Sequence, residues 1–188
     1  MIKIGITGML ASGKSTVAKL ISQRKHHIFS ADNVVNKLYE EYSFKQKLKK
    51  KFKLKNTIGI KNQIRKLVKN SKINITKLES LIHPNVREKM KIFTKLNKKN
   101  KLLVYEIPLL FESNLQKHFD KIIFVGAKKD IRLKRFTSKN KDKQLFLNLD
   151  KRQIKPNKKI RLSDYVIYNN LTLKKLKNKV KFIINKYE

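Results

Sequence analysis

The stretch GMLASGKS, residues 8–15, decides how the rest of the chain is interpreted. It matches G-x-x-x-x-G-K-[ST], the pattern of the loop that binds nucleotide phosphates. Residues 2–7 before it, IKIGIT, form a short apolar run typical of a buried strand, and residues 15–21 after it, STVAKLI, have the pattern of a helix. Strand, loop and helix in this order are the context in which the motif is specific. The sequence therefore predicts a phosphate-binding loop.

The residue types of this loop suit a bound anion. Gly8 and Gly13 permit backbone conformations in which successive N–H groups surround phosphate oxygens. The helix that follows adds unpaired N–H groups and the positive end of its dipole. Lys14 is expected to reach the β- and γ-phosphates of ATP, and the Ser15 hydroxyl is expected to bind Mg²⁺. The expected ATP-binding residues are Gly8, Met9, Leu10, Ala11, Ser12, Gly13, Lys14, Ser15 and Thr16.

Length and composition limit the class of protein. The 188 residues suit an α/β domain with an inserted or appended subdomain. The absence of cysteine excludes disulfides and thiolate metal sites. No apolar run approaches the roughly 18 residues needed to span a bilayer, and the first residues lack the pattern of a secretory signal. We therefore expect a cytoplasmic protein without a membrane partner.

The chain carries a formal net charge of +35. Such a charge attracts the phosphate backbone of nucleic acids through counterion release. The lysines, however, are spread along the whole chain, and arginine, the better residue for bidentate base contacts, is sparse. We therefore expect no specific nucleic-acid partner. The sequence leaves the assembly open between a monomer and a small homo-oligomer.

Further strands are predicted at residues 26–30, 101–106, 121–126 and 165–168, with helical segments between them. Strands that alternate with helices indicate a mostly parallel sheet with helices on both faces. Residues 34–99 have a polar helical pattern without an obvious strand, and they are expected to form a helical insertion. Within it, Pro84 is expected to separate two helices, because proline disfavours the helical conformation of the residue before it.

Two carboxylates come at the ends of predicted strands. Asp32 follows the second strand, on the side of a parallel sheet where ligands bind. It could orient an acceptor hydroxyl and take its proton, or it could cap the helix that follows. Glu106 ends the third strand and could hold a Mg²⁺-bound water, contact the acceptor, or simply be a solvated strand end. The sequence leaves these alternatives open.

Together and in this order, these motifs resemble the dephospho-coenzyme A kinase family. The resemblance rests on the loop and on SAD at residues 30–32, LIHP at 81–84, IPLLFE at 107–112, and Gln153 ahead of LSDYVIYNN at 162–170. It covers nearly the whole chain. It implies transfer of the γ-phosphoryl group of ATP to the ribose 3′-hydroxyl of dephospho-coenzyme A, giving coenzyme A. ATP and dephospho-coenzyme A are then the partners, and Mg²⁺ is the cofactor.

The resemblance also implies roles for individual residues. Lys14 and Ser15 bind the phosphates and Mg²⁺, and Asp32 is the expected base. Arg135 and Lys139 are alternative lid cations that neutralise the transferring phosphoryl group, since this catalysis is mostly alignment and charge neutralisation. The residues expected to bind the acceptor are Asp32, His83, Lys61, Arg65 and Glu106.

The chain departs from the family pattern at several positions. Met9 and Ala11 stand where the family usually has glycine, and Ser30 stands where it has an aspartate. Lys139 stands where an arginine is expected, and lysine supplies charge without a bidentate fork. These changes predict a slower enzyme and remove no group that the mechanism requires.

The implied fold is an α/β three-layer sandwich with a mostly parallel sheet, of the P-loop nucleoside triphosphate hydrolase or kinase type. Residues 1–33 and 100–188 are expected to form the nucleotide-binding core, with a mobile lid at about 136–157 that excludes water. Residues 34–99 are the expected acceptor-binding insertion. Two alternatives are another small-molecule or nucleotide kinase with a P-loop and, less favoured, a basic nucleic-acid-binding ATPase.

Overall fold

A computed structural model describes residues 1–23, 26–69, 71–140 and 142–187. It divides into two compact units, Met1–Ser30 with Asn97–Glu188, and Ala31–Leu96. Residues 24, 25, 70, 141 and 188, which fall within the predicted core, insertion and lid, lie outside the described residues.

A five-stranded sheet in the order β2-β3-β1-β4-β5 forms the centre of the first unit. Every strand pair is parallel, and β1 lies between β3 and β4. Strands β1, β3 and β4 are buried over most of their length, which explains their continuous apolar sequences. The predicted class, an α/β fold with a parallel sheet, is confirmed. The strands are β1 Ile2–Gly8, β2 His27–Ser30, β3 Leu102–Glu106, β4 Lys121–Gly126 and β5 Tyr165–Tyr168.

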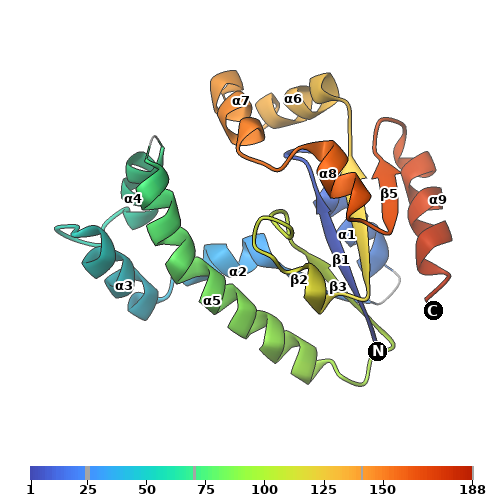
Figure 1. Ribbon diagram of the computed structural model, residues 1–188, viewed down its shortest axis with the longest axis horizontal. Helices are drawn as coiled ribbons and strands as arrows, with labels where there is room; N and C mark the ends of the chain where they lie inside the picture. The colour runs from blue at the N-terminus through green and yellow to red at the C-terminus, as the bar shows by residue number, and fades with distance from the viewer. Residues whose placement is uncertain (24–25, 70, 141, 188) are drawn as a thin grey trace. The chain divides into compact units, whose positions relative to one another are not determined.

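Helices α1 and α9 pack against the same face of this sheet (Figure 1). Val17 and Ile21 of α1 and Val180 and Ile184 of α9 are almost fully buried in one apolar cluster with residues of β1, β3, β4 and β5. Each such side chain contributes roughly 1.5–3 kcal/mol of burial free energy. The helical segments of this unit are α1 Lys14–Ser22, η1 Gln116–His118, α6 Lys129–Thr137, α7 Lys143–Lys151, α8 Pro156–Arg161 and α9 Leu173–Ile184.

A turn at residues 108–114 packs against β1. The Leu110 and Phe119 side chains fill the space beside Gly5, where an added Cβ would lie 2.7 Å from Leu110 Cδ1. The backbone N–H of Ile107 donates to Ile6 O at 2.9 Å, and the Thr7 hydroxyl donates to Pro108 O at 3.1 Å. The turn is therefore fixed to the central strand.

Helices are the only regular elements among the described residues of the second unit, and they are α2 Ala31–Leu38, α3 Tyr42–Phe52, α4 Ile60–Val68 and α5 Lys72–Leu96. Its apolar cluster contains Leu38, Phe44, Leu48, Ile60 and Ile64. Phe44 and Leu48 lie four residues apart in the lysine-rich α3, so they occupy one face of the helix. Helix α3 is therefore amphipathic, with its apolar face in the cluster.

Helix α5 runs through Pro84, so the expected division into two helices is wrong. Pro84 has no N–H to give to the carbonyl of Ser80, four residues earlier. In the next position the side-chain amide of Asn85 donates to Leu81 O at 2.7 Å and stabilises the same turn. Apolar residues before and after the proline are buried or partly buried, so tertiary packing continues across it and overrides the local preference.

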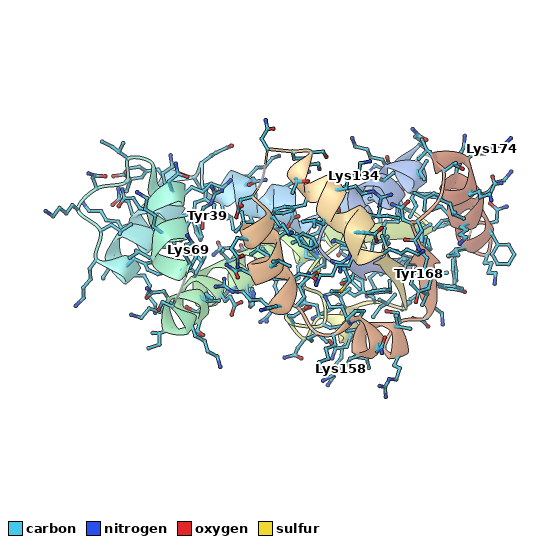
Figure 2. The ribbon with its side chains drawn as sticks, turned by 90° about the horizontal axis from the view of Figure 1, so that it is seen from above. Tyr39, Lys69, Lys134, Lys158, Tyr168 and Lys174 are labelled. Carbon is cyan, nitrogen blue, oxygen red and sulfur yellow. The ribbon has the colours of Figure 1, made fainter. Side chains whose placement is uncertain are left out.

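The charge of the chain is distributed over both units. Charged side chains project from many helices in Figure 2, where Lys134 of α6, Lys158 of α8 and Lys174 of α9 are labelled. None of the helices in the described parts of the chain combines the length and apolarity that crossing a bilayer would require.

Candidate active site

The predicted phosphate-binding loop joins the end of β1 to the start of α1. Gly8 has φ +152°, and an added Cβ would lie 2.0 Å from Val125 O. Gly13 has φ +97°, and a Cβ there would lie 2.2 Å from the Asn169 side-chain amide. Both positions therefore require glycine because of backbone conformation and the close approach of neighbouring groups.

Met9 and Ala11, the two departures from glycine, are accommodated differently. The Met9 side chain is only 5% exposed, so it is part of the packed interior. Ala11 has φ +57°, in the left-handed region that disfavours a Cβ by roughly 1–2 kcal/mol. The loop therefore keeps a glycine-like conformation at Ala11 at a cost in backbone strain.

Lys14 lies at the first position of α1 and is 9% exposed. Its Nζ donates to Met9 O at 3.0 Å and to Gly8 O at 3.4 Å. These contacts hold a buried cation within the loop. A cation there, together with the N–H groups at the start of α1, favours a bound phosphate.

Ser15 and Glu106 lie together although they are far apart in the sequence. The Ser15 hydroxyl donates to Glu106 Oε1 at 2.6 Å, and Glu106, the last residue of β3, is 6% exposed. The described residues contain no group of three or more His, Cys, Asp or Glu side chains that could hold a metal by themselves. A hydroxyl beside a carboxylate does suit Mg²⁺, which usually takes few protein ligands and completes its shell with phosphates and water.

The backbone of Leu10 is bound at its N–H and at its carbonyl by residues from later in the chain. Its N–H donates to Gln153 Oε1 at 2.8 Å, and its carbonyl accepts from Arg132 Nη1 at 3.2 Å. Arg132 is 5% exposed and forms a buried ion pair with Asp150. Neither Arg132 nor Asp150 is among the site residues that the sequence predicts.

Arg135 also contacts the loop, one turn after Arg132. Its Nη1 donates to Ser12 O at 3.4 Å, and its Nη2 donates to Asn169 O at 3.0 Å. The Asn169 side chain donates to Ser12 O at 2.9 Å. Lys139, the alternative lid cation, is exposed beyond the end of α6, and no contact of it with the loop is found in the part of the chain that the structure describes.

The remaining predicted site residues belong to the second unit. Asp32 is the second residue of α2 and is exposed, so it lies in the first turn and does not precede the helix as an N-cap would. Lys61 Nζ donates to Asn36 Oδ1 at 2.8 Å and lies 5.6 Å from the ring centroid of Tyr39. Arg65, one turn further along α4, is exposed.

Two titratable groups of this unit have shifted pKa values. Burial raises the pKa of the Tyr39 hydroxyl, and the positive charge of Arg65 partly opposes this. Burial lowers the pKa of His83, with Glu79 opposing the shift and Arg87 adding to it. His83 is therefore a neutral imidazole at pH 7, which can donate one hydrogen bond and accept another.

The sheet, the phosphate-binding loop and the Ser15–Glu106 pair define the class as P-loop kinases. The family model for dephospho-CoA kinase matches residues 2–175. The chain therefore belongs to the dephospho-CoA kinase family.

Individual proteins are similar to this chain in sequence and in fold. A dephospho-CoA kinase from Fusobacterium nucleatum is 33% identical over 184 residues, and the match covers 94% of this chain and 94% of that protein. The crystal structure of TT1252 from Thermus thermophilus has a TM-score of 0.83 and 25% identity, covering 100% of this chain and 98% of that one. The dephospho-CoA kinase structure from Campylobacter jejuni, at 23% identity and a TM-score of 0.65, covers 99% and 97% and supports the fold.

Proposed function

We propose that this chain transfers the γ-phosphoryl group of ATP to the ribose 3′-hydroxyl of dephospho-coenzyme A. The observation that carries the proposal is the loop geometry, with Lys14 held inside it and Ser15 bound to Glu106, in a chain of this family. The backbone N–H groups and Lys14 would bind the ATP phosphates. Catalysis then depends mainly on alignment and on neutralising the charge of the transferring group.

Ser15 and Glu106 are the residues that would hold Mg²⁺. The hydroxyl would be a direct ligand, and the Glu106 carboxylate would bind a water of the ion or replace one. When bound, the ion would neutralise charge on the phosphate oxygens. Both side chains already point toward one another, so the two oxygens converge without a change of rotamer.

Asp32 is the proposed base for the acceptor hydroxyl. Ser30, the last residue of β2, is in register with Glu106 of β3, and Asp32 follows two residues later in the chain. Its exposed carboxylate is accessible to an acceptor and can take the hydroxyl proton. The helical unit that begins here is the proposed acceptor-binding part. His83, Lys61 and Arg65 would contact the acceptor, the two cations through its phosphates.

Residues at about 136–157, which run from the end of α6 through α7, are the proposed lid over ATP. Arg135 would act from beside the loop through Ser12, whereas Lys139, exposed past the end of α6, would supply the more mobile positive charge. Closure of this segment would exclude water and limit wasteful hydrolysis of ATP. Figure 1 shows α6 and α7 beyond the end of the sheet at which β4 finishes.

A mass-spectrometric turnover assay tests the proposal. Each reaction contains the enzyme, Mg²⁺-ATP and one acceptor, which is dephospho-coenzyme A, AMP or shikimate. A further reaction contains single-stranded RNA in place of the acceptor, as a stimulant of ATP hydrolysis. We expect dephospho-coenzyme A alone to gain the mass of one phosphate. Transfer to AMP or shikimate instead would assign a different kinase, and hydrolysis of ATP only with RNA would refute transfer to a small molecule.

A further inference from the structure

The first unit contains a fully buried lysine that the proposed mechanism does not use. Lys159 of α8 is 0% exposed, and its Nζ lies 2.7 Å from Glu112 Oε1. Glu112 Oε2 is also buried and has no hydrogen-bond partner among the described residues. Because an isolated buried charge is strongly disfavoured, each of these two groups depends on the other.

Glu112 contacts more than the lysine. Its Oε1 also accepts the backbone N–H of Ile154 at 3.1 Å. Glu112 belongs to the turn at residues 108–114, which is hydrogen-bonded and packed against β1. The ion pair therefore joins residues 154 and 159 to a fixed part of the sheet.

The same segment reaches the phosphate-binding loop. We call residues 150–159 the strap. Gln153 of the strap accepts the Leu10 N–H at 2.8 Å, and Asp150 of the strap pairs with Arg132, which donates to Leu10 O at 3.2 Å. The backbone N–H and the carbonyl of Leu10, which belong to two consecutive peptide groups, are thus both bound by the strap, directly or through one side chain.

The orientation of these two peptide groups matters for binding ATP. A phosphate is bound by several loop N–H groups at once, so a rotation of one peptide changes the alignment of its neighbours. Small misplacements of a binding group are known to have large effects on phosphoryl transfer. The contacts of the strap with Leu10 therefore bear on how the loop N–H groups are aligned.

We propose that the Glu112–Lys159 ion pair positions the phosphate-binding loop, acting through Ile154 and Gln153 of the strap. The pair holds the strap at one end, and Gln153 transmits its position to Leu10. Glu112 and Lys159 are positioning residues, not catalytic ones. The inference rests on the proposed use of ATP and is independent of which acceptor is phosphorylated.

The test compares Lys159→Met with the apolar pair Glu112→Leu/Lys159→Met. Replacing a buried ion pair by apolar side chains of similar volume commonly preserves folding, so the double variant keeps the test valid if the single variant does not fold. MgATP binding is measured by calorimetry without acceptor. We expect the double variant to fold and to bind MgATP at least about tenfold more weakly, equivalent to about 1.4 kcal/mol. Its affinity for dephospho-coenzyme A should change less than about twofold.

The chain offers a control pair with the same types of contact, more exposed to solvent, at the opposite end of the strands. Asp164 pairs with Lys121 at 3.0 Å and accepts the Ile122 N–H at 2.9 Å, the same combination of lysine and backbone donor. Lys121→Met/Asp164→Leu should leave MgATP affinity unchanged. A folded Glu112→Leu/Lys159→Met variant that binds MgATP within about twofold of the wild type would overturn the inference.

A second comparison tests the route through Gln153. Gln153→Leu alone should weaken MgATP binding, and adding it to the double variant should weaken binding little further, because both changes release the same contact. Fully additive losses would show that the ion pair does not act through Gln153. Absence of transfer to dephospho-coenzyme A by the wild type would refute the proposed function and leave this binding test intact.

Discussion

The phosphate-binding loop and the helical unit are stabilised in different ways. The loop is bound by polar groups from distant segments, since Glu106, Gln153 and Asn169 each contact it across more than 90 residues. The helical unit is stabilised by an apolar cluster, and its candidate residues Asp32, Lys61 and Arg65 are exposed. Single changes at the loop should therefore reduce activity severely, whereas the fold should tolerate most single changes of exposed residues on the helical unit.

Replacing the loop cation should have the largest effect. Lys14→Ala removes a buried cation, and we expect kcat to fall by about three orders of magnitude or more, as for loss of a preorganised charge-stabilising group. Lys61→Ala, an exposed cation of the helical unit, should mainly raise KM for the acceptor. Steady-state kinetics of both variants measure this. Equal losses of kcat in the two variants would contradict the expected difference between the buried and the exposed cation.

Asp32 is the exception that the comparison requires, because it is exposed and yet proposed to react. Asp32→Asn keeps the size of the side chain and removes the base, so kcat should fall by about two to four orders of magnitude. Rapid-quench turnover with saturating substrates measures the change. Glu40→Gln, a second exposed carboxylate of the same unit, is the control. Near-normal turnover of a folded Asp32→Asn variant would show that Asp32 is not the base and has only a structural role in the first turn of α2.

Glu106→Gln tests whether the contact between Ser15 and β3 serves the metal. The amide oxygen can still accept the Ser15 hydroxyl, so the loop should keep its geometry while the negative charge is lost. We expect the Mg²⁺ concentration for half-maximal activity to rise about 10- to 100-fold. Titration of Mg²⁺ at fixed ATP gives the value, and circular dichroism monitors folding. An unchanged Mg²⁺ requirement would exclude Glu106 from the metal site.

Much of the fold could be predicted because its strands are local patterns. Buried parallel strands have continuous apolar sequences, and each predicted strand corresponds to one in the sheet within a residue or two. Helix α8 was not predicted, since its sequence PNKKIR is too short and too polar to show a helical period. Pro84 was misjudged because packing on both sides of it outweighs a local preference.

The site was predictable only where it is contiguous. The loop motif identifies residues 8–16 by itself, but the contact of Ser15 with Glu106 and that of Leu10 with Gln153 follow from strand order and the path of the chain. The spacing of Arg132 and Arg135 does contain a signal. They are three residues apart on one helix and therefore lie on one face, so a contact of one with the loop predicts a contact of the other.

Ala11 is a point where the loop itself is strained. Ala11→Gly relieves a positive φ but makes the unfolded chain more flexible, so the free energy of unfolding should rise by less than about 1 kcal/mol. Ala18→Gly, at an ordinary helical position in the middle of α1, should lower it by roughly 0.5–1 kcal/mol through backbone entropy and further through the loss of a buried methyl group. Urea denaturation of both variants measures whether the free energy of unfolding rises or falls in each. A loss of stability in Ala11→Gly would show that the strain at Ala11 is smaller than the gain in flexibility of the unfolded chain.

His83 should have the smallest effect, because it is only partly buried and belongs to the unit that tolerates change. Burial lowers its pKa below the ordinary 6.5, so between these two values the unfolded state binds more protons than the folded one. This contribution to stability is complete above pH 6.5 and is lost as the pH falls toward the lowered pKa. His83→Gln should therefore flatten the pH dependence of unfolding just below pH 6.5, measured by urea denaturation at several pH values. An identical pH profile for variant and wild type would show that His83 titrates alike in both states, and a steeper one would show that its pKa is raised by folding.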